Sequence, residues 1–118
     1  MPLAKRVAVT LPAGPKIEHT ISRIKWAEEH GFPDAWFSDS GAPDSLTQVA
    51  AIAHYTESLR IGVAVTPVYT RSPSVLAASA NVIAQLLPGR FVMGLGSSSQ
   101  TIMGQWNGIP LDLSLIHI

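Results

Sequence analysis

The sequence contains no cysteine, which excludes disulfides, thiolate metal sites and a cysteine nucleophile. Charged side chains are also scarce: they make up 14% of 118 residues, against about 25% in an average soluble domain. The eight basic and eight acidic side chains balance, so no excess of positive charge favours a nucleic-acid partner. Low charge together with 47% apolar residues indicates one globular unit with much of its chain buried.

Long apolar runs are missing as well. No segment reaches the ~18 apolar residues of a membrane span, and no apolar signal region follows Lys5 and Arg6. We therefore expect a cytoplasmic protein without a membrane partner. The four histidines, at positions 19, 30, 54 and 117, never lie four residues apart, the spacing that places two ligands on one helical face. We expect no metal site.

The sequence does contain a repeat of short apolar runs. These begin at Arg6, Asp34, Arg60 and Arg90, at intervals of 28, 26 and 30 residues. Non-alternating apolar stretches such as 63–65 are typical of strands that are covered on both faces. Between the runs, apolar residues recur with helical spacing, and alternating strands and helices imply a parallel sheet. The three helical stripes consist of Ile17, Ile21 and Ile24; Leu46, Val49, Ala50 and Ala53; and Leu76, Ala80, Ile83 and Leu87.

Punctuating residues mark the helix ends. Pro15 and Pro73 are predicted at the first helical position, where proline loses no hydrogen bond. Asp44 is a predicted N-cap for the second helix. Gly31 and Gly89 are predicted to end the first and third helices.

The connections between these elements are unequal. Helix-to-strand loops are short, whereas strand-to-helix loops are longer and richer in polar residues. Ligands bind at the carboxyl ends of the strands in both open parallel sheets and closed barrels. We therefore expect residues 38–40, 66–71 and 97–107 to meet around one pocket.

Three folds fit the alternating pattern: a (β/α)8 barrel, a flavodoxin-like sheet and half of a Rossmann fold. The Rossmann reading needs G-x-G-x-x-G after the first strand and an acidic residue about 20 positions later. Here Gly94 and Gly96 follow the fourth strand, Ser99 takes the third glycine's place, and the next acidic residue is Asp112. A flavodoxin-like sheet would need a fifth strand. The pattern therefore favours the barrel.

Three stretches, "DAWFSDSGAPDS", "RIGVAVTPVYTRSPSVLAA" and "GRFVMGLGSSSQTIMGQWNGIPL", together resemble the bacterial luciferase-like family, in particular its deazaflavin-dependent oxidoreductases. The resemblance covers residues 5–111. It implies an α/β fold in which residues 1–112 form the N-terminal half of a (β/α)8 TIM barrel, with four parallel βα units. Eight repeats of 28 residues give about 224 residues, close to the ~250 of a typical barrel.

The same resemblance implies an activity. We expect the intact protein to transfer hydride between coenzyme F420 and a small organic substrate. A flavin mononucleotide (FMN) monooxygenase is the alternative within the family, and a non-catalytic or non-functional fragment is the alternative outside it. The intact protein is expected to form a homo-oligomer.

The resemblance further implies the residues of the site. Asp39, the expected catalytic residue, would lie near the coenzyme ring, with Ser40 beside it. Many relatives have a histidine at the position of Ser40, and a serine cannot replace it as a base without an activating partner, so alcohol dehydrogenation is in doubt. Ala64, Val65 and Thr66 would form a bulge under the ring, with a cis peptide bond between Ala64 and Val65.

Gly96, Ser97 and Ser98 would complete the coenzyme pocket as the wall beside its ring and ribityl chain. We expect the main phosphate site to come from later strands. Trp106 would line the substrate side or pack within its loop. Arg71 would either hold an anionic group or neutralise a nearby carboxylate.

The last residues depart from the family pattern. Residues 113–118 are those encoded by CTG TCT CTT ATA CAC ATC, which begins a transposon-end adapter used for sequencing libraries. We therefore expect this segment to be a non-native tail, and the natural protein to diverge from this sequence near Leu113. A genuine apolar C-terminal strand is the alternative.

Overall fold

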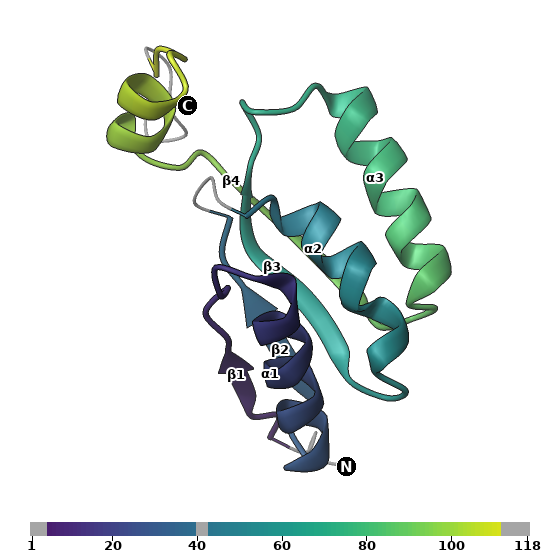
Figure 1. Ribbon diagram of the computed structural model, residues 1–118. Helices are drawn as coiled ribbons and strands as arrows, with labels where there is room; N and C mark the ends of the chain where they lie inside the picture. Colours follow the sequence, from purple (N-terminus) through teal and green to yellow (C-terminus); the bar gives the residue numbers. More distant parts are fainter. Residues whose placement is uncertain (1–4, 40–42, 112–118) are drawn as a thin grey trace.

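Four parallel strands in sequential order form the centre of the molecule (Figure 1). The computed structural model describes residues 5–39 and 43–111, to which the structural statements below refer. The strands are β1 (Ala8–Thr10), β2 (Asp34–Phe37), β3 (Arg60–Pro67) and β4 (Phe91–Gly96). They are joined by the helices α1 (Ile17–Glu29), α2 (Ser45–Ile52) and α3 (Pro73–Leu86). A 3-10 turn, η1 (Ala53–Tyr55), follows α2, and a π-helical turn, η2 (Thr101–Trp106), follows β4.

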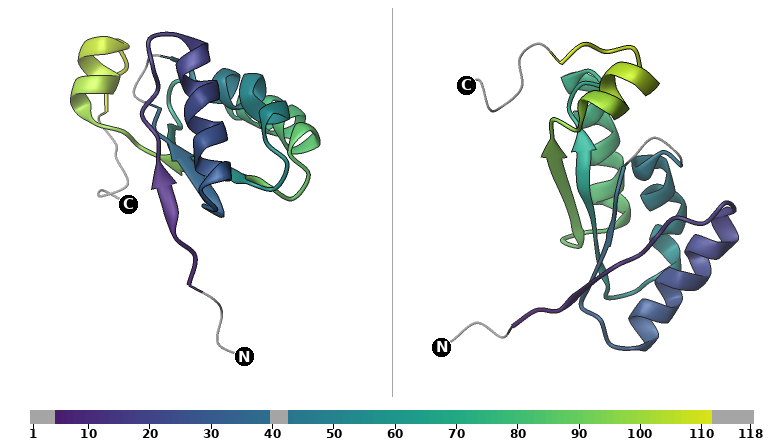
Figure 2. Two further views of the ribbon diagram at one scale, coloured as in Figure 1. Left: turned by 60° about the horizontal axis from the view of Figure 1, so that its bottom comes forward. Right: turned by 90° about the vertical axis from the view of Figure 1, so that its left-hand side faces the viewer.

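The three α-helices cover one face of the sheet and leave the other face bare (Figure 2). The hydrophobic core lies between this helical layer and the sheet. This arrangement confirms the predicted parallel α/β architecture of a partial barrel. The core residues include Ala35, Phe37, Ile61 and Val63 from the strands, and Ile24, Ala27, Val49, Ile52, Leu76 and Ile83 from the helices.

The bare face corrects one expectation, that the strands are covered on both sides. In β3, Ala64 and Val65 are exposed, and 41% of Val65 is accessible. No layer of the described chain lies over this inner face (Figure 2). β1 and β4 each have one neighbouring strand within the described residues, so the sheet has two edges here.

The helix ends follow the predicted signals with one exception. Pro73 is the first residue of α3, and the Ser72 side chain caps the helix by accepting from the Val75 amide. Asp44 caps α2, and its carboxylate accepts from the Thr47 amide at 2.9 Å. Gly31 and Gly89 follow their helices with positive φ angles of 77° and 68°.

The exception is the start of α1. Pro15 was predicted at its first position, but the helix begins two residues later, at Ile17, with Lys16 as the N-cap. The Lys16 carbonyl accepts from the His19 amide at 3.1 Å, so the first helical turn starts at Lys16. Pro15 lies in the bend before that turn.

Two carboxylates fix the end of the sheet opposite η2. The buried Asp34 receives Arg6 Nη2 at 2.8 Å and Arg60 Nε at 2.6 Å. Hydrogen bonds from Arg6, the largest effect, lower the pKa of Asp34 to about 2; burial opposes this shift and Arg60 adds to it. Glu28, at the end of α1, accepts backbone N–H groups from the loop before β3, including those of Glu57 at 2.9 Å and Ser58 at 2.7 Å.

Candidate functional site

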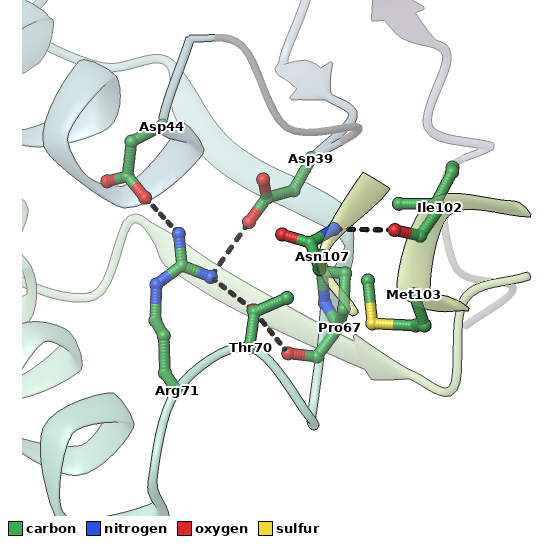
Figure 3. A pocket seen from close by; sticks show the side chains of 8 residues that line it. All are labelled: Asp39, Asp44, Pro67, Thr70, Arg71, Ile102, Met103 and Asn107. Atoms are coloured by element: carbon green, nitrogen blue, oxygen red, sulfur yellow. Dashed lines mark hydrogen bonds and ion pairs between the residues drawn. The ribbon is translucent and has the colours of Figure 1, made fainter. Parts of the chain in front are cut away.

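A cavity of about 170 Å³ lies at the carboxyl ends of the strands (Figure 3). Its lining combines residues from all three predicted loops with the cap of α2. The prediction that the loops meet around one pocket is therefore confirmed for the residues that the structure describes. The lining residues are Asp39, Asp44, Pro67, Thr70, Arg71, Ile102, Met103 and Asn107.

Asp39 follows β2, and only 6% of its side chain is exposed. Its Oδ2 accepts two hydrogen bonds, from Ser45 Oγ at 2.8 Å and from Arg71 Nη1 at 2.9 Å. Its Oδ1 makes no hydrogen bond with the described residues. Among the described residues, the carboxylate is therefore fixed through Oδ2 alone.

The contacts of Arg71 distinguish between its two expected roles, which were to hold an anionic group or to neutralise a nearby carboxylate. Its Nη2 binds the Asp44 carboxylate while Nη1 binds Asp39, so the guanidinium neutralises carboxylates (Figure 3). Burial lowers the pKa of Arg71, but the hydrogen bonds that it donates to Asp39 and Asp44 outweigh this effect and raise the pKa above its usual value. Arg71 therefore stays charged, and its charge is shared by two acids.

A bulge interrupts the pairing of β3 with β4. Val63 pairs with Met93 and Thr66 with Leu95, so β3 contains one more residue than β4 across this interval. The peptide bond between Ala64 and Val65 is cis, at the predicted position. The bulge places the Val65 side chain over β4, on the bare inner face of the sheet.

The glycines of β4 make room for this bulge. A Cβ atom on Gly96 would lie 2.5 Å from Val65 Cγ2, and one on Gly94 would lie 2.6 Å from the carbonyl oxygen of Val63. The space above both glycines is thus filled by β3. A ligand on this face would meet Val65 first.

Thr66 lies at the end of the bulge, where its hydroxyl is in an unusual environment. The residue is fully buried, and its hydroxyl has no hydrogen-bond partner among the described residues. A buried hydroxyl without a partner is costly, by about 1 to 3 kcal/mol.

The other predicted site residues are not among the residues that line the cavity. Ser97 and Ser98 follow β4 and are partly exposed, and Ser98 has a positive φ of 62°. Trp106 is 64% exposed and does not line the cavity. Ser40 lies outside the described residues.

Sequence reasoning missed three contributors. Asp44 was predicted only as a helix cap, Ser45 was not assigned to the site, and Asn107 was not singled out within its loop. Ser45 donates to Asp39 from the start of the next helix, and Asp44 receives Arg71 across 27 positions. No local pattern signals such a contact.

A sequence profile described as luciferase-like monooxygenase matches residues 2–115. The chain belongs to the luciferase-like monooxygenase family. Within this family it is 32% identical over 93 residues to 5,10-methylenetetrahydromethanopterin reductase of Methanolobus tindarius, covering 76% of this chain and 28% of that protein. It is 36% identical over 81 residues to an F420-dependent glucose-6-phosphate dehydrogenase of Nocardia farcinica, covering 60% and 24%. The second of these relatives is named as F420-dependent, in keeping with the sequence resemblance.

Solved structures of this family support the fold. The F420-dependent tetrahydromethanopterin reductase of Methanopyrus kandleri superposes with a TM-score of 0.80 at 24% identity, over 90% of this chain and 30% of that one. The FMN-bound oxygenating constituent of 3,6-diketocamphane monooxygenase from Pseudomonas putida also gives 0.80, at 18% identity, over 92% and 34%. The chain thus spans between a quarter and about a third of these relatives.

The described residues contain no group of three or more histidine, aspartate or glutamate side chains arranged to hold a metal ion. Among their helices, none combines the length and apolar character needed to cross a bilayer.

Proposed function

We propose that residues 1–112 form the N-terminal half of an oxidoreductase barrel that transfers hydride between coenzyme F420 and a small organic substrate. The relatives that are named as F420-dependent support this coenzyme. The observation that carries the proposal is the inner face beside the cavity. There, the bulge of β3 raises Val65 over Gly94 and Gly96 and creates an exposed apolar surface near the carboxyl end of β3.

The residues present fit a flat coenzyme ring. On the bare face, 41% of the Val65 surface is exposed. Gly94 and Gly96 have no side chains, so β4 does not cover Val65 at these positions. The neighbouring Thr66 hydroxyl is buried and has no hydrogen-bond partner within the described part of the chain, and a small movement of this strand end would let it meet a polar ligand atom. When bound, the deazaflavin would supply the carbon that accepts or donates hydride.

The chain's own residues would bind and orient. Ala64, Val65 and Thr66 would support one face of the ring, and Gly96, Ser97 and Ser98 would form the adjacent wall together with Ser40. Asp39, the proposed catalytic residue, would accept a hydrogen bond through its Oδ1 while Ser45 and Arg71 hold its Oδ2. This arrangement fixes the orientation of the reacting groups, which is the protein's main contribution to cofactor chemistry.

An FMN-dependent monooxygenase is the second candidate, and the FMN-bound structural relative favours it. Fluorescence titration of the complete protein with each coenzyme separates the two. We expect saturable quenching with F420 and weaker binding of FMN. Tight binding of FMN alone would overturn the choice of coenzyme, and binding of neither would favour a non-catalytic protein.

A matched pair of variants makes the titration specific to the site. Val65→Ala removes most of the proposed platform and is expected to weaken coenzyme binding about tenfold, since it removes two methyl groups from the contact. Val82→Ala removes the same atoms from an exposed position on α3 and should leave binding unchanged.

The complete protein requires the natural reading frame. We propose that residues 113–118 are an adapter-derived tail, and resequencing the source DNA across the codon for Leu111 tests this. An open frame of about two hundred further codons is expected for a barrel. A stop codon directly after Ile118 would contradict both the tail and the proposed activity of this chain. Cytoplasmic location and homo-oligomerisation of the complete protein remain predictions.

A further inference from the structure

The polar atoms that line the cavity divide into those already bonded and those that remain available. Arg71 is its only cationic lining residue among the described residues. This guanidinium is shared by Asp39 and Asp44, so the three side chains together carry one net negative charge. Thr70 contributes no free donor, because its hydroxyl donates to the Pro67 carbonyl at 3.1 Å.

Asn107 faces the cavity with an acceptor. Its Nδ2 donates to the backbone carbonyl of Ile102, as Figure 3 shows. A carbonyl can only accept, so this bond fixes the amide orientation and directs Oδ1 away from Ile102. Like Oδ1 of Asp39, this oxygen makes no hydrogen bond with the described residues. Two acceptors are therefore available in a cavity whose cation is already paired.

Charge and hydrogen bonding restrict what can bind here. An anionic group would meet one net negative charge and would have to compete with two carboxylates for Arg71. A group without N–H or O–H donors would leave the Asp39 oxygen desolvated and unpartnered, which is costly. At about 30 Å³ per water, 170 Å³ corresponds to about six waters, enough for one small ring.

We propose that this cavity selects an uncharged group that donates two hydrogen bonds, one to Asp39 Oδ1 and one to Asn107 Oδ1, and excludes anionic groups. This proposal rests on the proposed function, because it takes the cavity as part of the ligand site. It adds the chemical class of the group that binds there. It gives Arg71 the role of an internal counter-ion that positions Asp39.

Three small ring compounds test this selectivity directly. Uracil is neutral and has two N–H donors, 1,3-dimethyluracil is neutral without a donor, and orotate adds a carboxylate to the uracil ring. Saturation-transfer difference NMR on the 118-residue chain measures the binding of each. We expect saturable binding of uracil and affinities at least about tenfold lower for the other two, which corresponds to the loss of one charge-assisted hydrogen bond.

Variants assign the binding to this cavity. In Asp39→Asn, the amide oxygen must take the place of Oδ2 to receive Ser45 and Arg71, so an NH2 group replaces the free acceptor. Uracil affinity should therefore fall about tenfold. Asn107→Ala removes the second acceptor and should also weaken uracil binding. Asn81→Ala, the matched change at an exposed position on α3, should have no effect.

The possible results are distinct from those of the coenzyme titration. Equal or tighter binding of orotate or dimethyluracil, or no saturable binding of uracil, overturns the proposed selectivity even if F420 binds. An effect of Asn81→Ala equal to that of Asn107→Ala would place the binding elsewhere and would also overturn it. Failure of F420 to bind, with the uracil preference intact, refutes the proposed coenzyme and leaves the selectivity standing.

Discussion

The guanidinium of Arg71 lies 2.9 Å from Oδ2 of Asp39 and links the loop after β3 to the end of β2. Both side chains are largely buried, with 14% and 6% of their surfaces exposed. The contact joins positions 32 residues apart. It therefore ties the cavity's carboxylate to the neighbouring strand as well as to α2.

Removing the Arg71 charge is expected to destabilise the protein. Arg71→Gln leaves the buried Asp39 carboxylate without its cation, and we expect a loss of about 3 kcal/mol in the free energy of unfolding. Arg71→Lys keeps the charge without the planar fork and should cost less. Urea denaturation measures both, with Lys16→Gln at an exposed position as the control. A loss in Arg71→Gln no larger than in the control would contradict this account.

The contact between Gly96 and Val65 leads to a prediction about packing. Gly96→Ala would place a methyl group 2.5 Å from Val65 Cγ2, and we expect a loss of about 1 to 3 kcal/mol from overpacking. Gly104→Ala is the control, because its added carbon would meet nothing closer than 3.9 Å. In a Val65→Ala background the cost of Gly96→Ala should shrink. Additive losses in thermal or urea unfolding would show that Val65 is not the obstacle.

The lowered pKa of Asp34 leads us to expect that the free energy of unfolding falls in acid. Its folded-state pKa of about 2 lies below the ordinary value of 3.8, so its contribution is complete above pH 3.8 and disappears as the pH falls through about 2. Asp34→Asn should lower the free energy of unfolding at neutral pH by about 2 kcal/mol, since it removes charge-assisted bonds to Arg6 and Arg60. Its stability should also depend less on pH between 4 and 2. If the free energy of unfolding falls by the same amount between pH 4 and 2 in the unchanged protein and in Asp34→Asn, other groups cause the acid sensitivity.

Glu28 is predicted to protect the loop before β3. Its burial raises its pKa, but hydrogen bonds from Ser58 and Glu57 outweigh that effect and keep the pKa below its usual value. Glu28→Gln removes the charged acceptor, so we expect the amides of Glu57 and Ser58 to exchange with solvent about tenfold faster. Glu29→Gln, the adjacent exposed residue, is the control for hydrogen-exchange measurements. Unchanged protection in Glu28→Gln would refute the role.

The sequence predicted those features of the fold that depend on local patterns. The intervals between apolar runs identified four parallel strands, and Ser72–Pro73 and Asp44 located two helix starts within one residue. The unequal loops predicted one pocket at the carboxyl ends of the strands. These inferences succeed because periodicity, capping and strand direction are set by neighbouring residues.

The features that the sequence left open depend on contacts between distant segments. Arg71 had two equally plausible roles until its distances to Asp39 and Asp44 were known. The packing of Val65 against Gly96 could not be predicted, because the extra residue in β3 determines which side chain lies above this glycine. The peptide geometry between Ala64 and Val65 came from the family resemblance and not from composition or spacing.

The sequential strand order has a consequence for how the chain is made. Each of β2, β3 and β4 pairs with the strand that precedes it in the chain, and the connecting helices all pack on the same face of the sheet. An emerging polypeptide can therefore add one unit at a time from its N-terminus, with the newest strand serving as the template for the next. Growth of this kind keeps loop closures short for the four described strands, whereas in the proposed barrel the outer edge of β1 would stay unpaired until the last strand is made.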